Sequence, residues 1–139
     1  MKRFSLYAAA AALALSGGAH AQQQGVSKSE IVIGSIQDLS GPIAGFGKQV
    51  RLGMMLRVDE INEQGGINGR KINFITYDDG YSPPKAVEQA RKLVESDEVL
   101  LVFGPLGTPS NSAIQKYLNA KKVPQLFVAT GATKFGEPK

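Results

Sequence analysis

The sequence contains no cysteine, and its single histidine, His20, lies near the N-terminus. Without cysteine the chain forms no disulfide, so its stability depends on its hydrophobic core. The absence also excludes catalytic thiols and cysteine-ligated zinc. If His20 is removed with an N-terminal leader, no imidazole base remains, and a Ser-His-Asp hydrolase is excluded within these residues as well.

No apolar run is long enough to span a bilayer, which requires roughly 18 or more residues. The longest run, residues 4–15, follows two basic residues and precedes an Ala-His-Ala pattern at 19–21. A positive start, a short apolar run and a small-x-small site are typical of a secretory signal peptide. We therefore predict a signal peptide over residues 1–21. Because Gln22 and not a cysteine follows the cleavage site, we expect no lipid anchor and a protein free in a periplasm.

The chain also lacks a strong excess of positive or negative charge: it has 16 basic and 12 acidic residues and a net charge of +4. The basic residues are spread along the chain, whereas nucleic-acid binding calls for a clustered basic patch. Neither glycine-rich nucleotide motif, G-x-G-x-x-G or G-x-x-x-x-G-K-[ST], is present. The pair Asp78-Asp79 could bind a metal or accept a phosphoryl group, but after a strand it is better explained as a solvated or capping turn. We expect no nucleic acid, metal or cofactor.

From residue 31 onward, short β-branched runs alternate with amphipathic segments, after a polar leader over 22–30. Strands are predicted at 31–35, 71–77, 99–103 and 125–128. Helices are predicted between them, over 50–61, from Ser82 and from Thr108. This alternation indicates parallel strands joined by right-handed crossovers, which is a doubly wound α/β sheet. The strand order expected for this class is 2-1-3-4.

The helix boundaries carry recognisable signals. Ser82 and Thr108 are each followed by proline, a pattern that predicts an N-cap residue with proline at the first helical position. This reading explains Ser82-Pro83-Pro84-Lys85 better than the S-x-x-K motif of penicillin-binding enzymes does. Gly65-Gly66 is predicted to end the first helix, and a glycine-rich loop is expected over 37–47.

The predicted strand order places the loops after the first and third strands side by side, where open α/β sheets bind ligands. The loop at 104–108 follows a central strand and opens a helix, whose free N–H groups and positive dipole end suit an anion. A simple strand-to-helix turn explains the same residues equally well. Both interpretations stay open on these residues alone.

Several motifs in fixed order extend through the whole chain after the leader. They are Ile33-Gly34-Ser35, residues 39–47, 59–62 with 65–69, 77–79 with Pro84 and Ala86, residues 103–108 and residues 129–133. Together they make the chain resemble the N-terminal lobe of the periplasmic leucine/isoleucine/valine-binding-type proteins. The resemblance implies a fold of two α/β lobes that close on a ligand in the cleft between them.

The resemblance also implies roles for four residues. Thr108 stands where a serine usually holds the α-carboxylate of the ligand with its hydroxyl and N–H, and Thr133 where a second hydroxyl and N–H do so. Gly131 stands where a backbone carbonyl meets the α-ammonium group. Phe46 matches an aromatic side chain, often tyrosine, that lines the side-chain pocket. Pro109 departs from the pattern because it removes an N–H next to Thr108.

We therefore expect residues 31–139 to form the N-terminal lobe of a non-catalytic protein that binds a small amino acid of branched-chain type, or a related carboxylate. Its partner would be an ABC permease in the inner membrane. Because no helix follows the fourth predicted strand and no second lobe is present, we expect a truncated gene product or an incomplete sequence. The alternatives are a ligand-sensing domain of the same fold and a truncated α/β hydrolase or transferase domain.

Overall fold

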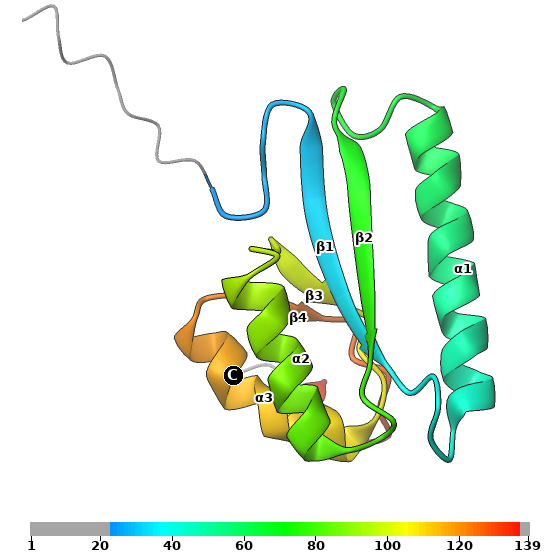
Figure 1. The fold of residues 1–139 in the computed structure, drawn as a ribbon, viewed down its shortest axis with the longest axis vertical. Coiled ribbons are helices and arrows are strands. Elements are labelled where there is room, and N and C mark those ends of the chain that lie inside the picture. The colour runs from blue at the N-terminus through cyan, green and yellow to red at the C-terminus, as the bar shows by residue number, and fades with distance from the viewer. Residues whose placement is uncertain (1–22, 137–139) are drawn as a thin grey trace, which may run out of the picture.

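The structure, a computed structural model, describes residues 23–136, so the predicted signal peptide lies outside the described residues (Figure 1). Strands and helices alternate along the described chain. The elements are β1 (Glu30–Gln37), α1 (Ala44–Glu63), β2 (Lys71–Asp78), α2 (Pro83–Glu95), β3 (Leu101–Phe103), α3 (Thr108–Ala120), β4 (Gln125–Leu126) and the 3-10 turn η1 (Thr133–Phe135). No described helix combines the length and the apolarity needed to cross a membrane.

The four strands form one parallel sheet in the order β2-β1-β3-β4, which confirms the predicted topology. The β1–β2 pair is long and regular, with Glu30 opposite Lys71 and Gln37 opposite Asp78. The other two strands are shorter than predicted. In particular, β4 ends at Leu126 because Phe127 has a φ of +55°, a left-handed conformation that interrupts an extended strand.

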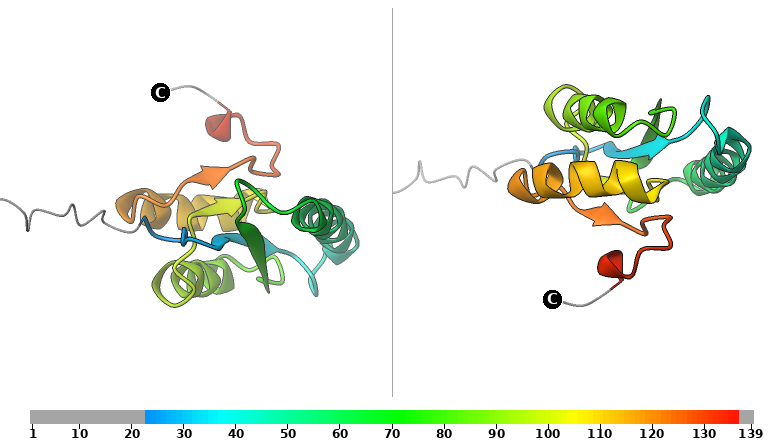
Figure 2. Two further views of the ribbon diagram at one scale, coloured as in Figure 1. Left: turned by 90° about the horizontal axis from the view of Figure 1, so that it is seen from above. Right: turned by 90° about the horizontal axis from the view of Figure 1, so that it is seen from below.

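The helices cover the sheet from both sides. Figures 1 and 2 show α1 on one side and the pair α2 and α3 on the other. Helix α2 packs against α3 and against β1 and β2, whereas α1 packs chiefly against β2 and β1. The main core lies under α2 and α3, and its fully buried members include Ile36, Ala90, Leu93, Val102, Ile114 and Leu118.

The opposite face of β3 and β4 is less covered than the core face. Leu126 is 40% exposed and Phe127 is 76% exposed, and the Phe127 ring lies 5.3 Å from that of Phe103. Parallel sheets are usually covered by helices on both faces. Among the described residues, only the short turn η1 follows β4.

Helix α1 begins earlier than the sequence indicated. A loop was expected over 37–47, but the helix starts at Ala44. The Asp38 carboxylate accepts hydrogen bonds from the N–H groups of Gly41, at 2.5 Å, and Ile43, at 2.8 Å, and so fixes the turn that enters the helix. Two glycines in the first turn of α1 weaken the local helix signal, and these tertiary contacts override it.

The segment before β1 is part of the fold. The side chain of Gln24 donates hydrogen bonds to the carbonyl oxygens of Val94 and Val99, at 3.3 and 3.2 Å. The N–H of Val32 donates to the carbonyl of Gly25 at 2.8 Å. The expected polar leader therefore lies against the amino end of the sheet, and its last residue, Glu30, already belongs to β1.

Candidate functional site

The loops that follow β1, β3 and β4 meet at the carboxyl end of the sheet. The N–H of Leu106 donates to the carbonyl of Ile36 at 3.0 Å, which ties the β3 loop to β1. The N–H of Gly107 donates to Ala129 at 3.0 Å, and the N–H of Ala129 donates to Pro105 at 2.9 Å. These bonds place the predicted ligand loops side by side, as the strand order requires.

Thr108 lies at the start of α3, but not as its cap. The N-cap is Gly107, with a φ of +101°, and Thr108 is the first helical residue, so the predicted capping role is wrong. Its hydroxyl makes no capping hydrogen bond to the helix backbone and lies 2.6 Å from the hydroxyl of Thr130. As the first helical residue, Thr108 has an N–H with no partner inside the helix. The helix dipole makes this end favourable for an anion.

Glycine is required at the cap for a second reason. Tyr81, after β2, has a φ of +60° and places its ring against the backbone of Gly107. A Cβ atom on residue 107 would lie 2.6 Å from Tyr81 Cε2, so the Tyr81 ring would have to move away to admit a side chain. The loop after β2 therefore also helps to position the start of α3.

Gly131 lies in the loop after β4 and Thr133 begins the turn η1 that follows it, and both are exposed. They border an open hollow of about 460 Å³. The residues around it are Gln125, Phe127, Val128, Thr130, Gly131, Ala132, Thr133, Phe135 and Gly136. Thr108 is joined to this loop through Thr130. Three of the four predicted site residues thus belong to one connected region.

Phe46 is the predicted site residue that stands apart. It lies in the first turn of α1 and is 59% exposed. In Figure 1, the start of α1 lies at the same end of the sheet as the start of α3. Phe46, in the first turn of α1, therefore lies at the carboxyl end of the sheet, but it is not among the residues that line the hollow.

Two buried amides, which the sequence analysis missed, hold the β3–α3 loop in place. Asn111 Nδ2 donates to the carbonyls of Pro105 and Gly107, at 3.1 and 2.8 Å, and Asn111 Oδ1 accepts from Gln125 at 2.6 Å. Gln37 Nε2 donates to the carbonyl of Gly104 at 2.7 Å. A buried carbonyl without a partner is costly, so these amides stabilise the loop that carries Thr108. Local sequence offers no signal for such contacts.

The pair Asp78-Asp79 has two different environments. Asp78 accepts hydrogen bonds from the N–H groups of Leu39 and Gly80 and from the Ser40 hydroxyl, so it joins the loops after β1 and β2. Burial tends to raise the pKa of Asp78, but these hydrogen bonds outweigh it and hold the pKa below the usual 3.8. The described residues contain no group of three ligands that could hold a metal.

Asp79 is fully buried, so the expectation of a solvated turn is wrong for this residue. Its Oδ1 accepts from the N–H of Tyr81 at 2.9 Å, while Oδ2 has no hydrogen-bond partner among residues 23–136. Burial raises the pKa of Asp79 above 3.8, and the charges of Asp38 and Asp78 add to the rise. The Ser110 hydroxyl beside it favours the charged form but is not in hydrogen-bonding geometry.

Asp79→Asn is expected to stabilise the fold at neutral pH. A carboxyl whose pKa is raised by folding contributes stability below its unfolded pKa and loses that contribution as pH rises through the folded pKa. The advantage of the variant should therefore shrink on acidification and vanish below about pH 3.8. Urea unfolding of parent and variant between pH 3 and 8 measures this difference. A difference in stability that does not change with pH would contradict the assignment. Glu88→Gln, an exposed control on α2, should change stability by less than about 0.5 kcal/mol.

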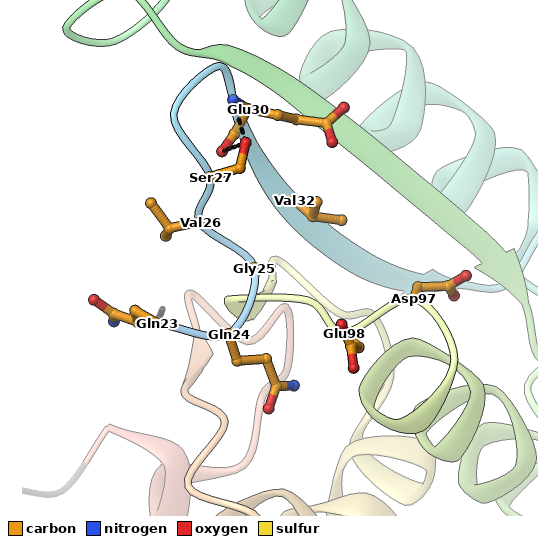
Figure 3. Close-up of a pocket in the computed structure, with 9 residues that line it drawn as sticks. All are labelled: Gln23, Gln24, Gly25, Val26, Ser27, Glu30, Val32, Asp97 and Glu98. Atoms are coloured by element: carbon orange, nitrogen blue, oxygen red, sulfur yellow. Dashed lines mark hydrogen bonds between the residues drawn. The ribbon is translucent and has the colours of Figure 1, made fainter. Parts of the chain in front are cut away.

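A second hollow, of about 430 Å³, lies at the opposite, amino end of the sheet (Figure 3). It is bordered by residues 23–27 before β1, by Glu30 and Val32, and by Asp97 and Glu98 after α2. Several of its polar groups hold the fold together: Gln24 binds two carbonyls, and Asp97 accepts from the Tyr77 hydroxyl at 3.0 Å. We assign no ligand to this hollow.

The parallel sheet and the converging loops at its carboxyl end define a ligand-binding α/β lobe. The sequence profile of the family described as periplasmic binding protein matches residues 30–139. The chain therefore belongs to the periplasmic binding protein family.

Relatives with known roles agree with this assignment. The chain is 41% identical over 81 residues to the Leu/Ile/Val-binding protein BraC3 of Rhizobium johnstonii, an alignment covering 58% of this chain and 22% of that protein. It is 36% identical over 110 residues to the Leu/Ile/Val-binding protein of Escherichia coli K12, covering 79% of this chain and 28% of the relative. The chain thus spans about a quarter of the length of these proteins.

Solved structures show the same lobe. A possible leucine/isoleucine/valine-binding protein from Rhodopirellula baltica superposes with a TM-score of 0.74 at 29% identity, covering 78% of this chain and 29% of that one. The branched-chain amino acid transporter substrate binding protein LivJ from Streptococcus pneumoniae, in complex with isoleucine, gives 0.67 at 31% identity, covering 70% and 28%. These proteins are named for binding a substrate and not for catalysis, so we set aside the hydrolase and transferase alternative.

Proposed function

We propose that this chain is the N-terminal lobe of a substrate-binding protein that presents a small amino acid of branched-chain type, or a related carboxylate, to an ABC permease of the inner membrane. Residues 1–21 act as the signal peptide, and residues 31–139 form the lobe in the periplasm. Thr108 and Thr133 bind the carboxylate, the Gly131 carbonyl meets the ammonium group, and Phe46 forms an apolar wall. The relatives named as Leu/Ile/Val-binding proteins support this choice of ligand.

The observation that carries the proposal is a pair of hydroxyls, one at the start of α3 and one in the loop after β4. Thr108 Oγ1 and Thr130 Oγ1 are 2.6 Å apart, and Thr130 Oγ1 also accepts from the N–H of Ala132 at 3.1 Å. An anion at the helix N-terminus receives hydroxyl and N–H donors together with the favourable end of the helix dipole. Hydrogen bonds to a charged group contribute about 1.5–3 kcal/mol each, more than those between neutral groups.

Thr108→Ala is expected to weaken ligand binding by about 1–3 kcal/mol, or roughly 5- to 150-fold, because a donor to the carboxylate is lost. A single lobe supplies only part of the contacts to the ligand. We therefore expect the parent to bind with a dissociation constant in the millimolar range, which corresponds to about half the binding free energy of a micromolar site. Chemical-shift titration of the exported protein with leucine, isoleucine, valine and aromatic carboxylates measures such affinities. Shifts should concentrate at Thr108, Gly131 and Thr133.

Matched variants separate a lost contact from a damaged fold. Thr108→Ser keeps the hydroxyl and should bind within about threefold of the parent. Ser96→Ala removes an exposed hydroxyl at the end of α2 and should leave affinity unchanged. If Thr108→Ala and Thr133→Ala both bind the best ligand as tightly as the parent, the assigned site is wrong.

A further inference from the structure

Helix α1 presents an apolar strip to solvent. Leu52 is 55% exposed and Leu56 is 73% exposed, and one helical turn separates them. The opposite side of the helix, where Gly47 is buried and Met54 lies near Gly104, packs against the sheet. Figure 2 shows α1 at the margin of the molecule, with the sheet on one side only. The two leucines therefore have no covering element among the described residues.

The charges along α1 oppose the helix dipole. Lys48 and Arg51 lie in its N-terminal half, whereas Asp59 and Glu63 lie in its C-terminal half, where Arg57 is paired with Glu60. The first turn has no acidic residue and the last turn has no basic residue, the reverse of the arrangement that stabilises a lone helix. The ion pairs found among residues 23–136 involve neither Lys48 nor Asp59. A partner helix that runs in the opposite direction would place each half beside charges of the opposite sign.

We propose that α1 packs antiparallel against α1 of a second copy of this chain, across a two-fold axis that passes between Leu52 and Leu56, at the level of residue 54 along the helix. Positions equally far from the axis then face each other, so Leu52 of one copy lies opposite Leu56 of the other. Lys48 and Asp59 lie on one flank of the strip, because their spacing is close to three helical turns. Lys48 lies six residues before the level of the axis and Asp59 five residues after it, so the two are offset by about one residue, or 1.5 Å, across the contact. Long side chains bridge such an offset, and each Lys48 pairs with an Asp59 of the second copy, twice by symmetry.

The proposed contact is small. Because the contact is only one helix wide, the area buried on each copy is below the roughly 800 Å² of a standard stable interface. The dimer is therefore weak and reversible. It is also separate from the proposed ligand site, because α1 and α3 lie on opposite faces of the sheet (Figure 2). Loss of dimerisation and loss of ligand binding are therefore distinguishable.

Sedimentation equilibrium of the exported protein, between about 10 µM and 1 mM, tests the proposal. We expect a monomer–dimer equilibrium in which Leu56→Glu raises the dissociation constant at least about tenfold. Lys48→Glu should weaken the dimer, and Lys48→Glu combined with Asp59→Lys should restore the parent affinity. Lys116→Glu makes the same charge change on an exposed residue of α3 and should have no effect. Circular dichroism verifies that each variant is folded.

Three results would overturn the proposal. The first is a monomer throughout the concentration range. The second is a charge-swapped double variant that associates no better than Lys48→Glu alone. The third is an association abolished by Phe127→Ser but not by Leu56→Glu, which would place the contact on the exposed face of β3 and β4.

Discussion

Replacing Gly47 with alanine is expected to destabilise the folded chain by at least about 3 kcal/mol. Gly47 is the one buried residue of α1, and a Cβ atom there would overlap the carbonyl oxygen of Asp38. The obstacle is backbone, so it cannot rotate away as a flexible side chain could. The helix would have to move off the turn that Asp38 holds through Gly41 and Ile43.

Gly53→Ala in the same helix is the matched control. A Cβ atom there meets nothing within 4 Å, so the substitution adds no clash. Alanine is the better helix former, and the variant should gain about 0.5–1 kcal/mol. Urea unfolding followed by circular dichroism measures both changes. If Gly47→Ala is as stable as Gly53→Ala, the close approach of α1 to the β1 loop is wrong.

Asn111→Asp is expected to cost about 3–5 kcal/mol at neutral pH, although the two side chains have nearly the same shape. Asn111 is fully buried, and its Nδ2 group donates to two carbonyl oxygens. The substitution places a carboxylate against those oxygens, with no cation to pair it. Burial raises the pKa of the new carboxyl, so the deficit should shrink as pH falls toward the ordinary aspartate value of about 3.9.

Asn119→Asp provides the comparison on the same helix. Asn119 is exposed near the C-terminal end of α3, where an added negative charge costs only about 0.3–1 kcal/mol through the helix dipole. Unfolding free energies of both variants at pH 7 and pH 4 measure the contrast. Equal costs at the two positions, or a cost at residue 111 that ignores pH, would show that the Asn111 network does not hold the loop.

Gly47 and Asn111 support the loops of the candidate site and do not contact the proposed ligand themselves. Gly47 lets α1 approach the β1 loop, and Asn111 fixes the β3–α3 loop that carries Thr108. A variant at either position should lose ligand binding together with stability, whereas Thr108→Ala should lose binding alone. Comparing unfolding with ligand titration therefore separates support of the site from direct contact with the ligand.

The sequence alone was sufficient for the order of elements and for the strand order 2-1-3-4. Hydrophobic periodicity and glycine and proline positions are local properties, and connection rules convert them into a topology. They also located Gly131 and Thr133 in the loop after β4 and Thr108 at the start of α3. The family resemblance, which the comparisons confirm, rested on motifs within the same loops.

The tertiary structure decided what each residue in those loops does. Asp79 became a buried carboxyl, Gly107 took the cap that Thr108 was expected to provide, and Phe127 ended β4 early. Asn111 and Gln37 acquired roles through hydrogen bonds to distant segments, such as the bond from Gln37 to Gly104, 67 residues away. Burial and such bonds depend on which segments meet in space. A periodic pattern records only which face of an element is apolar, so it predicts the fold but not these contacts.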